Sequence, residues 1–277
     1  MGSFPFLVLW NPAPWVGVFL LGALGGRFQR PGRWPRWAFR VGLGLCAAAF
    51  GTPLQVLAEH SLTAAMGQRL LVTGVAVPLL ISALSPAFWR GLWRRFGIVG
   101  RFLVRPLIAL LLFNGAYGVT AVPGLWNWLC THPAAFWAQN LLFVALALLF
   151  WWPVLSPIRE VPRLHPLVAL LYLFVGGIAL TPLFVFWSLL SKTPAYAVDA
   201  AGAHLLSLSA MADERLGGLI MKAGALLAYG VVFVGIFWRW RDDGSGSGEA
   251  PCVGSASRTP VDLAEVRRRR AEKQESS

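Results

Sequence analysis

The chain has 277 residues, of which 57% are hydrophobic and 13% are charged. A soluble domain is usually about 45–50% apolar and about 25% charged, so this composition excludes an ordinary water-soluble enzyme and a disordered chain. What remains is a membrane protein whose chain crosses the bilayer several times. The formal net charge of +12 would indicate a nucleic-acid partner in a soluble protein. In a membrane protein it is typical of basic inner loops, and we expect no nucleic acid to bind.

A helix that spans a bilayer needs about 20 mostly apolar residues, and seven stretches of this chain meet that requirement. A β-barrel is excluded because apolar runs such as 141–152 do not alternate with polar residues. The predicted fold is therefore all-α, a seven-helix transmembrane bundle over residues 1–241, with a flexible, charged cytoplasmic tail over 242–277. The expected helices cover 7–26, 38–58, 66–88, 103–121, 134–156, 166–188 and 216–238.

The basic residues predict how these helices are oriented. Of the 24 lysines and arginines, 20 fall in alternate loops or after the last helix, which the positive-inside rule places on the inner face. The opposite loops hold only Lys192 and Arg215. With an odd number of helices, this asymmetry predicts an outer N-terminus and an inner C-terminus. Tryptophans near both ends of the helices, such as Trp89 and Trp126, are typical of the aromatic belts at headgroup level.

Two basic residues, Arg69 and Lys222, lie inside expected helices, about one or two turns from the outer end. Charged groups within a membrane are costly and usually face the interior of the bundle. The polar residues at the same expected depth are Gln68, Gln139 and Asn140, and the possible counter-charges at that level are Glu59, Asp213 and Glu214. One interpretation is a polar pocket that opens outward. The other is that both cations extend along the helix surface to the outer headgroups.

The cysteines are too sparse for a disulfide framework and show no CxxC spacing. Cys130 and His132 form a Cys-x-His pair, whose thiolate and imidazole could bind copper with His60 and Met66 as further ligands. Alternatively, His132-Pro133 caps the start of the next helix. No pair or triad of catalytic side chains stands out, and no acid lies in the middle of an expected helix, so we do not expect an enzyme.

Four apolar blocks follow one another in a recognisable order and spacing. They are TAAMGQRLLVTGVAVPLLISALSPAF (63–88), HPAAFWAQNLLFVALALLFWWPVLSP (132–157), LHPLVALLYLFVGGIALTPLF (164–184) and DERLGGLIMKAGALLAYGVVFVGIFWRW (213–240). Together they resemble the CtaG family of bacterial cytochrome c oxidase assembly factors, over residues 5–241. The resemblance implies a multi-pass protein of the bacterial inner membrane that is linked to copper delivery. Its expected partners are terminal oxidase subunits or a copper chaperone.

The chain departs from this family where motif histidines are expected. The stretch AMGQR matches a His-Met-x-Gln-His-like motif but has Ala65 and Arg69 in place of the histidines. Phe136 and Asn140 match two further histidines, and Lys222 stands where a tryptophan is common. An arginine guanidinium offers no lone pair to a metal, so the copper site of the family is expected to be lost. The positions that fit the family pattern are Met66, Gln68, Asp213, Gly217, Gly218 and Met221.

Two functions follow as hypotheses. The first is a CtaG-like membrane protein that assists the assembly of cytochrome c oxidase without the histidine copper site. The second is an outward-facing membrane protein that binds a small solute or anion with Arg69 and Lys222. The candidate binding residues are Met66, Gln68, Arg69, Gln139, Asn140, Asp213, Met221 and Lys222. The candidate metal ligands are Cys130, His132 and His60, and the cofactor stays open.

Overall fold

The computed structural model describes residues 12–25, 28–158, 160–161, 163–190, 193–196 and 208–246. Within these ranges the regular structure is helical, apart from one isolated antiparallel bridge between Gln29 and Leu84. The predicted all-α fold is therefore confirmed. By internal contacts the chain forms two units, Met1–Phe237 and Trp238–Ser277. The described part of the second unit is the helical end 238–246, where the Arg241 guanidinium lies 4.0 Å from the ring centroid of Trp238. Most of the expected tail lies outside the described residues.

Each of the seven stretches expected from the sequence overlaps a helix. The helices in chain order are α1 (Pro12–Gly25), α2 (Arg33–Gly51), α3 (Leu54–Ala58), α4 (Leu62–Arg69), the π-helix η3 (Leu70–Ala76), α5 (Val77–Ala83), α6 (Pro86–Leu103), α7 (Pro106–Thr120), α8 (Pro123–Thr131), α9 (Pro133–Leu155), α10 (Pro166–Ala179), α11 (Thr181–Val185), the π-helix η4 (Phe186–Leu190) and α13 (Ala210–Gly246). Helices α6 to α10 each begin with a proline. Its missing N–H costs nothing there, because the first amides of a helix have no intrahelical partner.

In the part of the chain that the structure describes, four helical stretches are long and apolar enough to cross a membrane, namely Leu62–Ala83, Pro133–Leu155, Pro166–Leu189 and Ala210–Trp238. The bent pair of α6 and α7 raises the number to five if it is one span. Neither α1, which is described over 14 residues, nor α2, which begins with an arginine-rich turn, is among them. The structure therefore supports a membrane protein with four to five candidate spans among the described residues.

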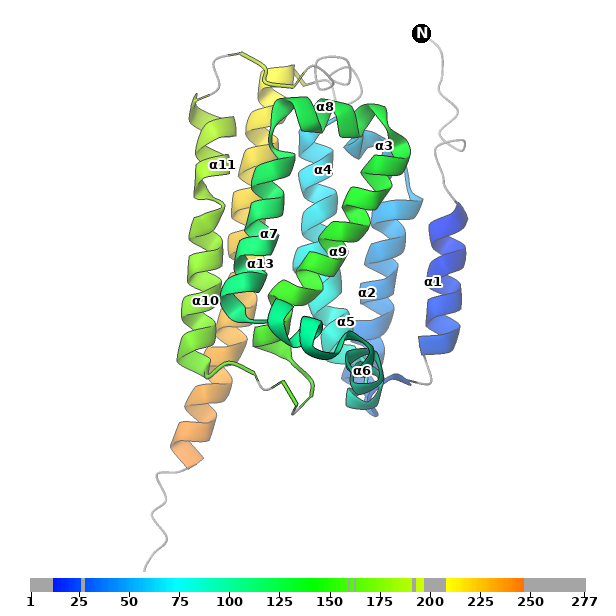
Figure 1. The fold of residues 1–277 in the computed structure, drawn as a ribbon, viewed down its shortest axis with the longest axis vertical. Coiled ribbons are helices and arrows are strands. Elements are labelled where there is room, and N and C mark those ends of the chain that lie inside the picture. The colour runs from blue at the N-terminus through cyan, green and yellow to red at the C-terminus, as the bar shows by residue number, and fades with distance from the viewer. Residues whose placement is uncertain are drawn as a thin grey trace, which may run out of the picture. The chain divides into compact units, whose positions relative to one another are not determined.

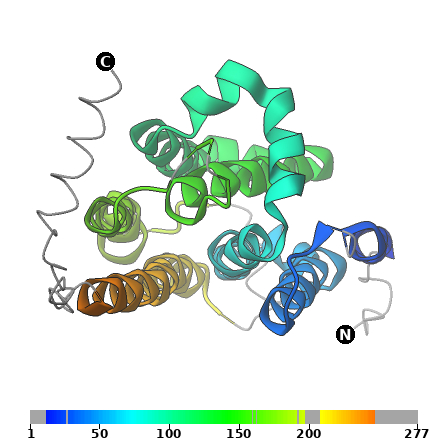
Figure 2. The same cartoon turned by 90° about the horizontal axis from the view of Figure 1, so that it is seen from below.

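The continuous segment α4–η3–α5 lies in the middle of the first unit (Figure 1). Helix α2 packs against η3 and α5 on one side and against α1 on its other side. Helix α9 packs against η3 and α5 of the central segment and also contacts α7. Helices α10 and α13 complete the bundle (Figure 2). The candidate site residues come mainly from this central segment and its neighbours, so they are placed in the interior.

The central segment contains the π-helix η3, which the sequence analysis did not predict. Pro78 follows it within α5, and a proline inside a helix removes one hydrogen bond and crowds the carbonyl four residues earlier. The wider π turn relieves this crowding, and such turns are frequent at functional sites. The carbonyl of Thr73, which lies in η3, accepts a hydrogen bond of 2.7 Å from Trp151 Nε1 on α9. The wide turn thus ties the central segment to α9.

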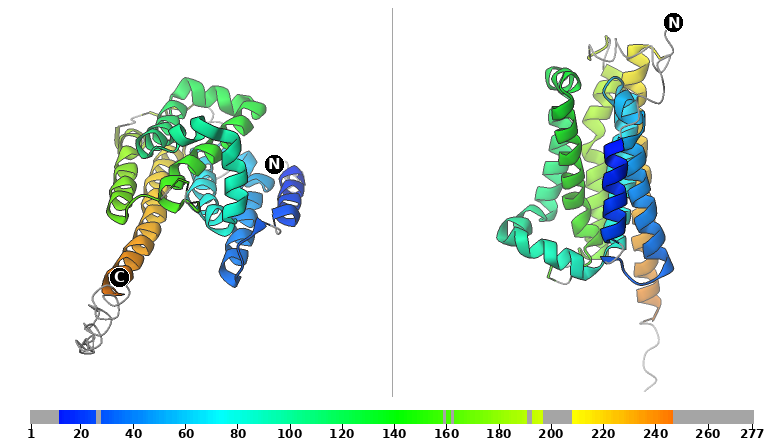
Figure 3. Two further views of the ribbon diagram at one scale, coloured as in Figure 1. Left: turned by 60° about the horizontal axis from the view of Figure 1, so that its bottom comes forward. Right: turned by 90° about the vertical axis from the view of Figure 1, so that its right-hand side faces the viewer.

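The hydropathy pattern predicts a basic loop over residues 89–105, and this prediction is wrong. Residues Pro86–Leu103 instead form the helix α6. Ser85 caps its start by accepting a hydrogen bond from Phe88 N, and Pro86 takes the first position. Helix α6 is bent by 84° relative to α7, so it runs across the ends of the long helices (Figure 3). Gly97 has a φ of +50° and kinks the helix. Glycine adopts this conformation with little strain because it has no Cβ.

Candidate functional site

Arg69 ends α4 and is buried, with 4% of its surface exposed. Its guanidinium carbon lies 4.3 Å from the ring centroid of Phe143, 5.3 Å from that of Trp126 and 5.8 Å from that of Tyr117. The faces of aromatic rings attract a cation over these distances. Nη1 also donates a long hydrogen bond of 3.5 Å to Thr120 Oγ1. We name Arg69 with these three rings the aromatic box.

Side-chain amides line the neighbouring space around Gln55. Gln68 Nε2 donates to Gln55 Oε1 and to the carbonyl of Ala49, both at 2.7 Å. Asn140 Nδ2 donates to the same Gln55 oxygen at 3.4 Å. The structure therefore brings Gln68, Arg69 and Asn140 together, as the shared depth in the sequence predicted. Gln55 was missed, although a glutamine inside an apolar stretch was a visible signal.

Several buried polar side-chain atoms on α4 and α9 have no hydrogen-bond partner among the described residues. They are Arg69 Nη2, Gln68 Oε1 and both amide atoms of Gln139. Leaving such an atom unsatisfied costs about 1–3 kcal/mol, so a water or a small polar ligand would be stabilised here. The adjoining cavity has a volume of about 10 Å³ and is lined by Arg69, Asn140 and Phe143 among others. It is close to the smallest size that holds one water, so a larger solute does not fit in this conformation.

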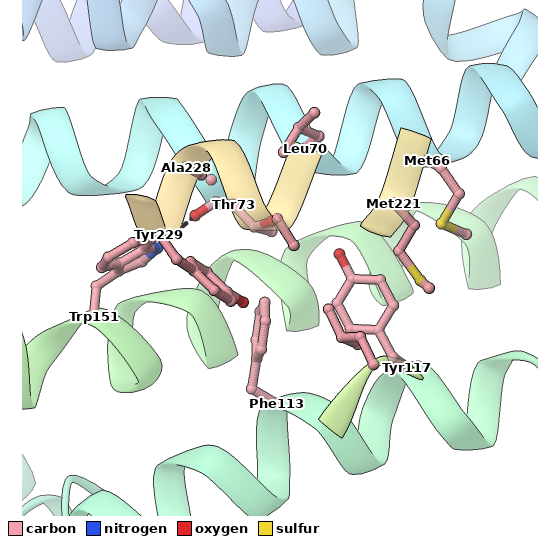
Figure 4. Close-up of a pocket in the computed structure, with 12 residues that line it drawn as sticks. Met66, Leu70, Thr73, Phe113, Tyr117, Trp151, Met221, Ala228 and Tyr229 are labelled. Atoms are coloured by element: carbon pink, nitrogen blue, oxygen red, sulfur yellow. Dashed lines mark hydrogen bonds between the residues drawn. The ribbon is translucent and has the colours of Figure 1, made fainter. Parts of the chain in front are cut away.

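Met66 and Met221 line a second buried cavity (Figure 4). Its volume is about 20 Å³, enough for about one water. The thioethers of both methionines lie on the side of Tyr117, whose ring also belongs to the aromatic box. Thr73 lines both cavities. The two small cavities are therefore neighbours that share one wall, and both methionines belong to the same region as Arg69.

Lys222 has other partners. Its Nζ donates hydrogen bonds of 2.7 Å to the carbonyl of Gly177 on α10 and to Thr181 Oγ1 on α11. It lines a separate, mostly apolar cavity of about 190 Å³ between α10 and α13. Lys222 therefore lines neither of the two cavities that adjoin the aromatic box, although Tyr229 lines both its cavity and that of the methionines. The structure does not bring together the two cations that the anion-binding hypothesis combines.

Asp213 caps α4 from the first turn of α13. Its Oδ1 accepts a hydrogen bond of 2.6 Å from Ser61 Oγ, and its Oδ2 accepts one of 2.7 Å from Leu62 N. Thr63 Oγ1 donates to the backbone carbonyl of Asp213 at 2.9 Å. A carboxylate at the N-terminus of a helix satisfies free amides and interacts favourably with the helix dipole. Asp213 therefore joins two candidate spans, and the structure records no ion pair between it and Arg69 among the described residues.

Glu214, the next residue of α13, also accepts hydrogen bonds from backbone amides of another segment. Its Oε1 accepts hydrogen bonds from the amides of Ala195, at 2.6 Å, and Tyr196, at 3.0 Å. Tyr196 in turn donates from its hydroxyl to the carbonyl of Ala121 at 2.7 Å, and its ring lies 5.9 Å from that of Trp126. Tyr196 thus packs beside Trp126, one of the rings of the aromatic box. The sequence analysis did not single out Tyr196, because nothing in the local pattern indicates its partners.

The three candidate metal ligands do not form a cluster. His60 Nδ1 lies 2.9 Å from the carbonyl of Val56, one turn earlier in its own segment. His132 Nδ1 lies 2.8 Å from the carbonyl of Trp128, and its ring stacks on that of Trp128 with centroids 4.7 Å apart. Cys130 lies within α8. Within the described ranges, no group of three or more His, Cys, Asp or Glu side chains is placed to hold a metal ion. His132 occupies the cap position of α9 without a side-chain cap bond.

Comparison with known proteins gives one match. A sequence model of the family described as cytochrome c oxidase caa3 assembly factor (Caa3_CtaG) matches residues 17–243. Neither the comparison with curated proteins nor the comparison with solved structures found a match. The matched range contains the aromatic box, both methionines and the Asp213 cap. Because it covers most of the chain, the resemblance inferred from the four sequence blocks is confirmed, and the chain belongs to the family of cytochrome c oxidase caa3 assembly factors.

Proposed function

We propose that this protein assists the assembly of a heme–copper terminal oxidase from within the membrane, and that it does so without a histidine copper site. The single observation that carries the second part is the aromatic box, in which a buried guanidinium occupies the position matched to a family histidine. Its role would be to hold oxidase subunits or a copper chaperone. The family membership supports the first part.

The chemistry of the box argues against a metal at this position. An arginine side chain has five N–H donors and no acceptor, so it cannot ligate copper. Its fixed positive charge would repel a copper ion in a low-dielectric interior, where interactions between charges are strong. The rings of Phe143, Trp126 and Tyr117 instead stabilise a cation that the chain itself supplies. Arg69 and these three rings come from α4, α7, α8 and α9, so the box lies where four helices meet.

We further propose a bacterial inner-membrane topology with seven spans, an outer N-terminus and an inner C-terminus. The helical stretches that match the seven expected spans support the count, with α1 and α2 as the first two. The asymmetry of the basic residues supports the orientation. In this topology α6 lies at the inner face, and residues 242–277 form a separate charged tail in the cytoplasm.

Co-purification from membranes tests the proposal. Affinity-tagged protein, extracted in mild detergent after growth with copper, is expected to retain oxidase subunits or a copper chaperone. We expect its own copper and heme contents to stay far below one per chain. A Cys130→Ser/His132→Asn variant serves as the matched control for metal. Stoichiometric copper in the wild type that disappears in this variant would overturn the metal-free part. Purification without any oxidase component or chaperone would overturn the assembly part.

A further inference from the structure

A basic cavity lies against α6, apart from the aromatic box. Its volume is about 370 Å³, and it lies between α6 and the segment that follows α9. It is lined by Arg90, Trp93, Arg94, Gly97, Arg101, Ile158 and Glu160. Three guanidinium groups thus face one acidic side chain across a space much larger than a water needs. This charge balance favours an anionic ligand.

The sequence of α6 explains how these arginines gather. Arg90 and Arg94 are four residues apart, which places them on one face of the first part of α6. Gly97, whose φ of +50° kinks α6, lies between Arg94 and Arg101 and lines the cavity with both of them. A Cβ added at Gly97 would meet no atom within 4 Å. Its lack of a side chain therefore leaves room between the arginines. Guanidinium groups bind phosphate oxygens through paired hydrogen bonds, which makes arginine well suited to such a ligand.

Trp93, which forms part of the cavity wall, is stacked on a second indole. The rings of Trp93 and Trp152 are 4.9 Å apart and nearly parallel, at 7°. Trp89 meets Trp152 edge-on at 5.1 Å. The indole N–H of Trp93 is buried and has no hydrogen-bond partner among the described residues. Trp93 itself lines the cavity, so its stacked ring forms part of the wall beside the three arginines.

The surroundings of the cavity point to a ligand with acyl chains. Helix α6 also exposes large apolar side chains, among them Phe96 at 52%, Ile98 at 85% and Val99 at 65%. A helix with a basic face and an apolar face typically lies in the headgroup region of a membrane. Its orientation across the ends of the long helices agrees with that position (Figure 3). A soluble phosphate would gain nothing from these apolar side chains.

We propose that this cavity binds the phosphate of an anionic phospholipid, with the acyl chains along the apolar side chains of α6. Arg90, Arg94 and Arg101 hold the phosphate oxygens, and Trp93 supports the headgroup. Glu160 disfavours a second negative charge on its side of the cavity. The bound lipid would fix α6 against the end of α9. This inference does not depend on the proposed function, since a lipid site could exist in a protein with another role.

Native mass spectrometry of the full-length protein can test the site. Protein from mixed micelles with equal amounts of phosphatidylglycerol and phosphatidylcholine is expected to retain phosphatidylglycerol selectively. The Arg94→Gln/Arg101→Gln variant is expected to lose this selectivity by roughly tenfold or more, because it removes two charge-assisted contacts. The matched control is Arg95→Gln/Arg105→Gln, which removes the same charge from neighbouring positions outside the cavity lining, and it should keep the selectivity.

A variant that binds more phosphatidylglycerol shows that a change in binding is not the result of misfolding. Glu160→Gln removes the acidic side chain from the cavity and is expected to increase retention of phosphatidylglycerol. Equal losses in the two double variants would overturn the site in favour of general surface attraction. Displacement of the lipid by millimolar inorganic phosphate would also overturn the proposal, because it would identify a site for a soluble anion. The proposal would also be overturned if Glu160→Gln left the retention of phosphatidylglycerol unchanged and the Arg94→Gln/Arg101→Gln variant kept its selectivity.

Discussion

Arg69 is a buried cation whose partners are aromatic rings. No ion pair with a carboxylate is recorded for it among the described residues, although the sequence offered Asp213 as a counter-charge. Asp213 instead caps α4 through Ser61 and Leu62. The cost of burying the guanidinium is only partly offset by cation–π attraction and one long hydrogen bond. This buried guanidinium stands at the position that the resemblance matches to a family histidine, so its substitution tests the account directly.

Replacement of Arg69 by methionine separates function from stability. Arg69→Met keeps a long side chain but removes the buried charge, and such replacements are often neutral or stabilising. We expect its thermal unfolding in detergent to occur at or above the wild-type temperature, whereas oxidase assembly in cells should fall. Arg69→Lys keeps the charge and serves as the control. A large drop in the unfolding temperature of Arg69→Met would show that the box is mainly structural.

Asp213 has a structural role that a second substitution tests. Asp213→Ala leaves Leu62 N and Ser61 Oγ without their acceptor and is expected to lower the free energy of unfolding by about 1–3 kcal/mol. Asp213→Asn retains one acceptor oxygen and should lose less. Unfolding in denaturant, compared with that of the Glu160→Gln variant at a different site, measures the difference. An Asp213→Ala protein as stable as the wild type would contradict the cap.

At the scale of elements, hydropathy predicted the helices well and the connections poorly. Each apolar stretch became a helix because the backbone groups must be satisfied within the segment. Residues 89–105 are too rich in arginine for a span, and hydropathy alone therefore indicated a loop. Their periodic arginines and apolar residues were the better signal for the helix α6. The π-helix η3 could not be predicted, because Pro78 permits either a kink or a wider turn, and the contact with Trp151 selects between them.

Close packing of α13 on α4 leads to a prediction with an internal control. A Cβ at Gly217 would lie 2.8 Å from Leu62 Cγ and 3.0 Å from the backbone carbon of Leu62. Gly217→Ala is therefore expected to destabilise the protein by about 1–3 kcal/mol, because the backbone of α4 would have to move. A Cβ at Gly230, on the same helix, would meet nothing within 4 Å. Gly230→Ala should be neutral or slightly stabilising.

Thermal unfolding of both glycine variants in the same detergent checks this difference. If Gly217→Ala and Gly230→Ala shift the unfolding temperature equally, the close approach of α13 to α4 is wrong. Small residues at such contacts let membrane helices approach closely, and this packing replaces the hydrophobic driving force that is absent in lipid. The sequence shows Gly217 and Gly218 as neighbouring small residues, but it does not identify the helix that they face.

At the scale of the whole molecule, the rotation of each helix limited what the sequence could predict about the site. Gln68, Arg69 and Asn140 line one small cavity, in keeping with the tendency of polar groups in a membrane helix to face the interior. Lys222 was expected beside them on the same argument. It turns instead toward Gly177 and Thr181 on a different side of α13. Helices that are apolar on all sides give no signal for their rotation, so only the packed bundle distinguishes the two directions.

The proposed topology can be tested by cysteine labelling in a variant that lacks the native cysteines. Thr131 and Arg95 are both exposed, on α8 and α6 respectively. An impermeant maleimide added outside is expected to label the Thr131→Cys variant, whereas the Arg95→Cys variant should react only after the membrane is opened. Labelling of the Arg95→Cys variant from outside would contradict the orientation.

The central claim is that this protein supports oxidase assembly without a histidine copper site. The most direct measurement is oxidase activity in membranes of a strain that lacks the gene, grown under copper limitation. We predict that activity and oxidase copper content fall, and that both recover with a wild-type copy but not with the Arg69→Met variant. Normal oxidase activity and copper content in the deletion strain under copper limitation would contradict the claim.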